Sequence, residues 1–130
     1  MFELSIKRRF AAAHRLEGYR GQCAALHGHT WTVEVVVEGE RTDSCGMLID
    51  FKVLKEMVDG IIIELDHTCL NDVEYFAGAG AAINPTAENL AVYVFSMIKE
   101  KLKEISPDIT VRGVRIWESP DASAYYRGEQ

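Results

Sequence analysis

Three of the four histidines are spaced in a way that suits a metal site. His27 and His29 are two residues apart in "HGHTWTVEVVVEGE" (27 to 40), a stretch whose Val, Thr and Trp predict a β-strand. Residues two apart in a strand point to the same face, so both imidazoles project to one side. His14 lies near the end of another predicted strand, Phe2 to Arg15, and can complete a triangle. Three imidazoles suit zinc and leave its fourth position open for water or substrate.

Cys23, four residues before His27, allows two interpretations of this stretch. As a fourth ligand it would close a structural zinc site of one thiolate and three imidazoles. As a thiol beside zinc and imidazoles it would have a lowered pKa, and the thiolate would act as a base or nucleophile. A chain this rich in apolar residues does not need the metal staple that very small domains need, which favours the catalytic cysteine. For each histidine the alternative is an ordinary hydrogen-bonded residue.

Two further sites carry acidic groups that suit chemistry. In "ELDHTCLND", Asp66 precedes His67 at a predicted helix end, where a carboxylate can orient an imidazolium and form a proton relay. The alternative is a helix-ending turn with His67 exposed. Glu118 ends a predicted strand and shares the parity of Ile116, so we expect a half-buried carboxylate that accepts two parallel donors. Its alternative is a solvated strand end.

The remaining sequence predicts the elements that position these residues. Asp50 caps a helix whose apolar spacing continues to Leu65, and Pro85 and Thr86 introduce a second amphipathic helix that "ISPD" ends. "ITVRGVRIWES" and "ASAYYRG" predict two closing strands. The order predicts an α+β fold, a four-stranded antiparallel sheet with two helices on one face. Its two bare edges predict assembly into a larger barrel.

Composition narrows the class of protein. The 130 residues, 48% of them hydrophobic, predict one domain spanning residues 1–130. The net charge of -6 argues against binding to nucleic acid, which needs clustered Lys and Arg. The apolar runs are too short to cross a bilayer and no leader pattern is visible, so we expect a cytoplasmic protein with no membrane partner. An odd number of cysteines fits a reducing compartment.

Six blocks in order carry a resemblance that runs over essentially the whole chain: "FAAAHRL", "CAALHGH", "GMLIDF", "LDHTCLND", "NPTAENLA" and "WESPDASAYYRGE". Together they resemble the 6-pyruvoyl-tetrahydropterin synthase family. The three residues between Cys23 and His27 resemble one branch, the 6-carboxy-5,6,7,8-tetrahydropterin synthases of the queuosine pathway. The resemblance implies the tunnelling fold, in which such sheets join around a trimeric barrel and two trimers stack into a hexamer.

The resemblance also implies a role for each candidate residue. The zinc ligands would be His14, His27 and His29; Cys23 would be the catalytic base, Asp66 with His67 a relay contributed by a neighbouring subunit, and Glu118 the pterin anchor. The implied substrate is 7,8-dihydroneopterin triphosphate. Proton transfers, internal redox and loss of triphosphate would precede a retro-aldol type cleavage that releases acetaldehyde and leaves the 6-carboxy product.

Alternatives remain at this point. A pyruvoyl synthase would stop after triphosphate loss, a non-catalytic zinc-stabilised module would assemble through its sheet edges, and a zinc hydrolase would leave Cys23 without a role. Thr86 caps a helix, and neither it nor Glu88 has an assigned catalytic role. Cys45 and Cys69 are read as packing or incidental thiols. The candidate cations for the triphosphate are Lys7, Arg8, Arg9, Arg15, Arg20 and Arg127.

Overall fold

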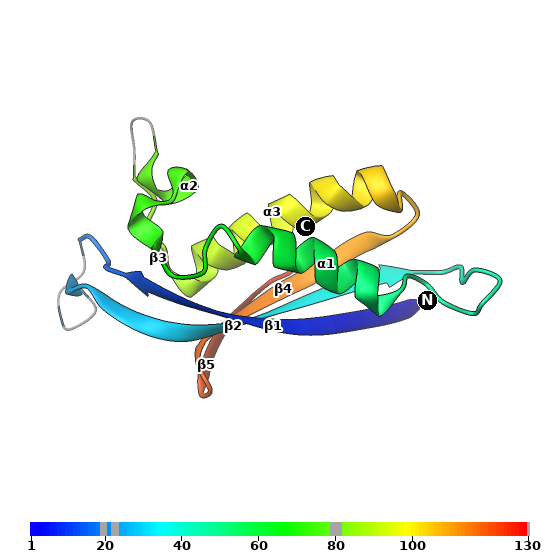
Figure 1. Ribbon diagram of the computed structural model, residues 1–130, viewed down its shortest axis with the longest axis horizontal. Coiled ribbons are helices and arrows are strands. Elements are labelled where there is room, and N and C mark those ends of the chain that lie inside the picture. The colour runs from blue at the N-terminus through cyan, green and yellow to red at the C-terminus, as the bar shows by residue number, and fades with distance from the viewer. Residues whose placement is uncertain (19–20, 22–23, 79–81, 130) are drawn as a thin grey trace.

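The computed structural model describes residues 1–18, 21, 24–78 and 82–129 (Figure 1). Its strands are β1 (Phe2–His14), β2 (His27–Gly39), β3 (Thr68–Cys69), β4 (Thr110–Ser119) and β5 (Ala122–Tyr126). Its α-helices are α1 (Phe51–Ile62), α2 (Glu74–Ala77) and α3 (Ala87–Ile105), with a short 3-10 turn, η2, at Leu70–Asp72. The α+β class is confirmed.

The sheet differs from the predicted four antiparallel strands. It has five strands in the order β3-β1-β2-β4-β5, and β3 runs parallel to β1. β3 pairs Thr68 with Ala12 and Cys69 with Ala13, so it covers only one end of the β1 edge. The two residues of β3 are too few to show an alternating pattern. The four residues of α2 are likewise too few to show a helical period. The number of strands, the purely antiparallel pairing and the number of helices were therefore predicted wrongly.

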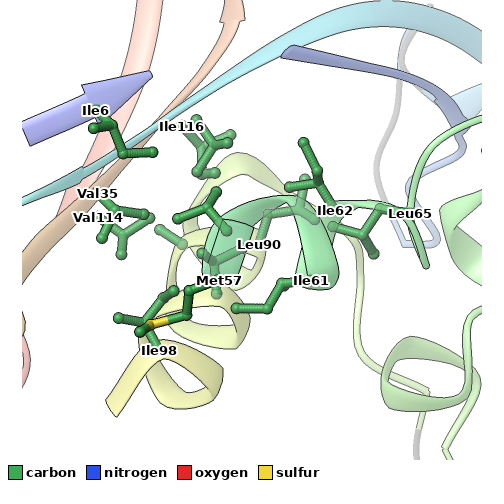
Figure 2. Close-up of a cluster of buried hydrophobic side chains, with 14 of the residues drawn as sticks. Ile6, Val35, Met57, Ile61, Ile62, Leu65, Leu90, Ile98, Val114 and Ile116 are labelled. Atoms are coloured by element: carbon green, nitrogen blue, oxygen red, sulfur yellow. The ribbon is translucent and has the colours of Figure 1, made fainter. Parts of the chain in front are cut away.

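The core lies between the sheet and its two long helices. Figure 1 shows α1 and α3 over one face of the sheet, and Figure 2 shows the side chains that fill the space between them. On β2, Val33, Val35 and Val37 are fully buried while the residues between them are only partly covered. The alternation arises because one face of the sheet packs against the helices. No helix within the described ranges is long and apolar enough to cross a membrane.

Both long helices begin at the residues that the sequence indicated. The Asp50 side chain accepts a hydrogen bond from Lys52 N, and the Thr86 hydroxyl accepts one from Asn89 N. Each cap satisfies a backbone donor that the first helical turn leaves unpaired. Since α3 begins immediately after Pro85, this cap also fixes the turn that approaches the end of β1.

Candidate metal centre

Three histidines and one glutamate converge beyond the apolar core. One ligand atom from each of His14, His27, His29 and Glu118 lies within 4.8 Å of the others. The antiparallel register of β1 and β2 places His14 directly opposite His27 and Ala12 opposite His29. The side chains share the helix-covered face because their strand positions have the parity of the buried core residues.

The hydrogen bonds of two histidines fix which nitrogen carries the proton. His14 Nδ1 lies 2.8 Å from the carbonyl oxygen of Pro85, and His27 Nδ1 lies 2.7 Å from that of Ala25. A carbonyl only accepts, so each Nδ1 donates and each neutral ring keeps a lone pair on Nε2. These two Nε2 atoms are 3.0 Å apart. Two lone pairs at this distance repel unless a cation lies between them, so the pair fits a metal ion.

His29 completes the fit. Its Nε2 atom is buried and has no hydrogen-bond partner among the described residues. A buried nitrogen without a partner costs free energy, and a metal ion would satisfy it. Second partners on the Nδ1 atoms, as His14 and His27 have, are usual for metal-bound histidine. The donor set of three imidazoles and one carboxylate suits zinc.

Trp31 packs against two of the clustered histidines, His14 and His29. It is fully buried, and its ring centroid lies 5.0 Å from that of His14 and 5.2 Å from that of His29. Its indole N–H donates to the carbonyl of Ala12, the residue opposite His29. The indole therefore holds both imidazoles in edge contact. Sequence reasoning counted Trp31 only as a strand former, although its parity with His29 indicated the shared face.

Two asparagines hold the chain where it leaves β1. Asn71 accepts from Arg15 N and donates to Arg15 O, both at 2.9 Å. Asn84 does the same to Glu17, at 2.9 Å and 2.8 Å. Each side-chain amide thus replaces a strand partner for one residue of the segment that follows His14. Such amides cannot be assigned this role from sequence, because their partners are 56 and 67 residues away.

An Asn84→Ala protein should bind zinc about tenfold more weakly than wild type. This is the lower end of the loss in metal affinity that follows when a hydrogen-bond partner of a metal ligand is removed. The side chain fixes the turn whose Pro85 carbonyl accepts from His14. Competition with a chelator of known affinity measures the effect. The Asn84→Asp side chain can still accept from Glu17 N but cannot donate to Glu17 O, so its zinc affinity should lie between those of wild type and Asn84→Ala. An unchanged zinc affinity in Asn84→Ala would show that the turn is held without this side chain.

Burial lowers the pKa of His14 and of His29 below the ordinary value of 6.5. In both cases Glu118 acts in the opposite direction. Both rings therefore stay neutral near pH 7, as metal ligands must. Their lowered pKa values also mean that below pH 6.5 the unfolded chain binds protons that the folded chain does not.

The metal-free protein should consequently lose stability as the pH falls below 6.5. Chemical denaturation of the metal-free chain at about pH 7.5 and about pH 5.5 measures this change in the free energy of unfolding. A His29→Gln variant removes one of the two rings whose pKa is lowered, so its free energy of unfolding should fall less between these pH values than that of wild type. Equal stability of the metal-free wild type at both pH values would contradict the expectation.

Asp66 and His67 form the contact that the sequence indicated. Asp66 Oδ2 lies 3.0 Å from His67 Nδ1, and Asp66 Oδ1 accepts from Ala11 N at 2.9 Å. The Ala11 N–H and then His67 lower the pKa of the Asp66 carboxyl. The chain breaks its helical path at His67, whose φ is 59°, and the imidazole is 82% exposed. This break lets two adjacent side chains meet.

Asp66 and His67 are not part of the metal cluster of their own chain. His67 borders a shallow hollow of about 530 Å³ lined by Ala11, Ala12, Ala13, Gly28, His29, Thr30, His67 and Thr68. Ala11 and Ala13 alternate with the buried Ala12 and His14, so their side chains point to the other face of the sheet. His67 shares this hollow with His29 but contributes no atom to the metal cluster.

The other predicted residues fall into three groups. Cys23 and Arg20 lie outside the described residues. Among the candidate cations, Arg8 is paired with Asp59 at 2.9 Å and Lys7 lies over the ring of Trp117 at 4.8 Å. Cys45 is exposed, Cys69 is half-buried, and Glu88 is an exposed residue of the first turn of α3. None of these described residues joins the metal cluster.

Known proteins resemble the chain over nearly its whole length. The sequence profile described as 6-pyruvoyl tetrahydropterin synthase matches residues 3–129. A 6-carboxy-5,6,7,8-tetrahydropterin synthase of Bacillus subtilis is 35% identical over 97% of this chain and 85% of its own length. A dihydroneopterin monophosphate aldolase of Pyrococcus furiosus is 38% identical over 84% of this chain and 82% of its own length.

The fold has a solved counterpart as well. The structure of a 6-pyruvoyl tetrahydropterin synthase of Caenorhabditis elegans superposes with a TM-score of 0.78 at 32% identity, covering 99% of this chain and 98% of that one. The three relatives bear different activity names, so they agree on the family and not on one reaction. The chain belongs to the 6-pyruvoyl tetrahydropterin synthase family.

Proposed function

We propose that the protein is a zinc-dependent 6-carboxy-5,6,7,8-tetrahydropterin synthase of queuosine, or deazapurine, biosynthesis. The observation that carries the proposal is the convergence of unprotonated imidazole nitrogens from His14 and His27 with His29 Nε2, which has no hydrogen-bond partner among the described residues. The choice within the family is supported by the spacing of Cys23 and by the name of the Bacillus subtilis relative. The substrates would be 7,8-dihydroneopterin triphosphate and one water molecule, and the products 6-carboxytetrahydropterin, acetaldehyde and triphosphate.

The three histidines would hold zinc through Nε2. Bound there, zinc would supply Lewis-acid chemistry that lowers the pKa of substrate hydroxyl groups. Trp31 and the Pro85 carbonyl keep the rings from turning, so the ligand nitrogens are already oriented before the metal arrives. The protein would therefore lose little rotational freedom when it binds the ion.

Proton transfer would fall to Cys23 and His67. The Cys23 thiolate would take a proton from the substrate side chain, and His67 would return one elsewhere. Asp66 would orient the His67 ring and stabilise its charged form through the 3.0 Å contact. Because His67 borders a hollow lined by Ala11 and Ala13, whose side chains point away from the helix-covered face, we propose that the pair serves the site of a neighbouring subunit.

Glu118 would hold the pterin ring. Its half-buried carboxylate can accept two parallel bonds from the N–H and amino donors of the ring edge. This contact would fix the position of the substrate rather than break bonds.

We further propose that residues 1–130 act as one pterin-binding domain within a cytoplasmic hexamer, built from two trimeric barrels. The support is the open sheet: β3 covers only the Ala12–Ala13 end of β1. The rest of that edge has no strand partner among the described residues. An exposed edge with free backbone groups favours pairing with another chain. Three cysteines without a disulfide pattern fit the cytoplasm.

Product analysis tests the reaction. The zinc-loaded protein is incubated separately with 7,8-dihydroneopterin triphosphate and with the corresponding monophosphate, and acetaldehyde and 6-carboxy pterin are followed together. Both products should appear in equal amounts from the triphosphate. Loss of triphosphate without acetaldehyde would instead identify a pyruvoyl synthase, the activity named for the Caenorhabditis elegans relative. Turnover of the monophosphate alone would favour the aldolase activity named for the Pyrococcus furiosus relative. No turnover of either compound would support a non-catalytic zinc module.

A further inference from the structure

We propose that Glu118 is a displaceable fourth metal ligand: it closes the metal site in the resting protein and leaves it when a pterin ring binds. The first half concerns metal binding alone. The second half rests on the proposed function, because it gives the same carboxylate to the substrate once the substrate is present.

The distances match a four-ligand site. Glu118 Oε1 lies 3.4 Å from His14 Nε2 and 3.4 Å from His29 Nε2. Four ligand atoms placed tetrahedrally at about 2.0–2.1 Å from zinc are separated from one another by about 3.3–3.4 Å. The contact between His14 Nε2 and His27 Nε2, at 3.0 Å, is slightly shorter. The carboxylate oxygen therefore stands where a fourth ligand would stand.

The position of the proton on the neutral His14 ring supports the same conclusion. Its Nδ1 donates to the Pro85 carbonyl, so the neutral ring offers Glu118 a lone pair and no proton. A carboxylate oxygen that faces this lone pair at 3.4 Å is repelled by it. A cation between the two atoms removes the conflict. It also gives the carboxylate the positive charge that three neutral imidazoles do not provide.

The backbone at Glu118 is irregular in a way that aims its side chain. β4 and β5 pair regularly from Val114 to Trp117, and the register then shifts before Ser119. Glu118 lies within this bulge, and bulges next to functional sites commonly re-aim one side chain. The residue keeps the parity of the fully buried Ile116, so the carboxylate points to the cluster rather than to the opposite face.

Glu118 also lies on the solvent side of the site. Its side chain is 35% exposed, compared with 24% for His29 and 0% for His14. An entering molecule therefore meets the carboxylate before it meets the buried ring of His14. A pterin edge with two donors would compete for the carboxylate and draw it away from the metal. The fourth position would then open only when the correct ring is bound, which couples substrate recognition to metal access.

Cobalt-loaded protein tests the first half without any turnover. The visible absorption of cobalt(II) reports its coordination, and chelator competition gives the zinc affinity. Glu118→Gln should change the cobalt spectrum and weaken zinc binding by at least about tenfold. The matched control is Asp121→Asn, an exposed carboxylate in the turn between β4 and β5, which should behave as wild type. A spectrum and zinc affinity unchanged in Glu118→Gln would overturn the proposal, since Glu118 would then not touch the metal.

A second result would also overturn it. A thiolate-to-cobalt absorption band that disappears in Cys23→Ala would give the fourth position to Cys23 instead.

The second half is tested by adding 7,8-dihydroneopterin, with its binding followed by pterin fluorescence. The wild-type cobalt spectrum should change on binding, while the Glu118→Gln spectrum should change much less because no carboxylate remains to be displaced. A pterin that binds to wild type without altering the cobalt spectrum would overturn the exchange. If Glu118 is shown to bind cobalt but the protein turns over no pterin, the ligand assignment stands and the proposed function fails.

Discussion

A His29→Ala protein should lose its zinc and its product formation together. His29 Nε2 is buried and has no hydrogen-bond partner among the described residues, and alanine at this position leaves two imidazoles and one carboxylate to hold the ion. We expect zinc affinity to fall by more than the roughly 10–100-fold that loss of an outer partner causes. Metal content by elemental analysis and acetaldehyde release measure the two effects. His29 is preferred to the fully buried His14, whose replacement would also leave a cavity in the fold.

The matched control for this variant is Thr32→Ala. Thr32 lies on the same strand, and its parity turns it away from the cluster. It should keep one zinc per chain and wild-type turnover. A His29→Ala protein that keeps full zinc content would show that His29 is not a ligand, and that the cluster forms for another reason.

Cys23→Ala should keep its zinc and lose turnover. If Cys23 is the general base, its removal should slow product formation by about 10²–10⁴-fold, the usual contribution of a positioned base. The three histidines and Glu118 form the cluster without it, so metal content should remain at one ion per chain. Acetaldehyde release measured beside zinc content separates the two quantities.

Cys45→Ala is the control, because Cys45 is an exposed thiol remote in sequence from the metal ligands. It should match wild type in both measurements. A Cys23→Ala protein that sheds its zinc would identify a closed clamp of one thiolate and three imidazoles. The proposed catalytic function would then be wrong.

Much of the fold could be predicted because its long elements have clear periods. The predicted strands Phe2 to Arg15 and 27 to 40 differ by one residue each from β1 and β2, and both helix caps are where the sequence placed them. Strand parity alone put His27 and His29 on one face. The antiparallel pairing of these two strands then brought His14 opposite His27.

What could not be predicted depends on partners distant in sequence. Sequence reasoning assigned no carboxylate to the metal and gave Glu118 only to the substrate, because the bulge that aims Glu118 at the histidines leaves no periodic trace. The Pro85 carbonyl that fixes the ring of His14 is 71 residues away. β3 is held by Ala12 and Ala13, not by any pattern of its own.

The position of Trp31 gives the molecule a built-in optical reporter. Its indole touches His14 and His29, while Trp117, the second tryptophan of the chain, lies under the ammonium group of Lys7. A paramagnetic ion held by the histidines should quench the emission of Trp31, and replacing Trp117 removes the second source of emission. In a Trp117→Phe background, the remaining fluorescence would follow occupancy of the cluster in real time, without a substrate or a dye.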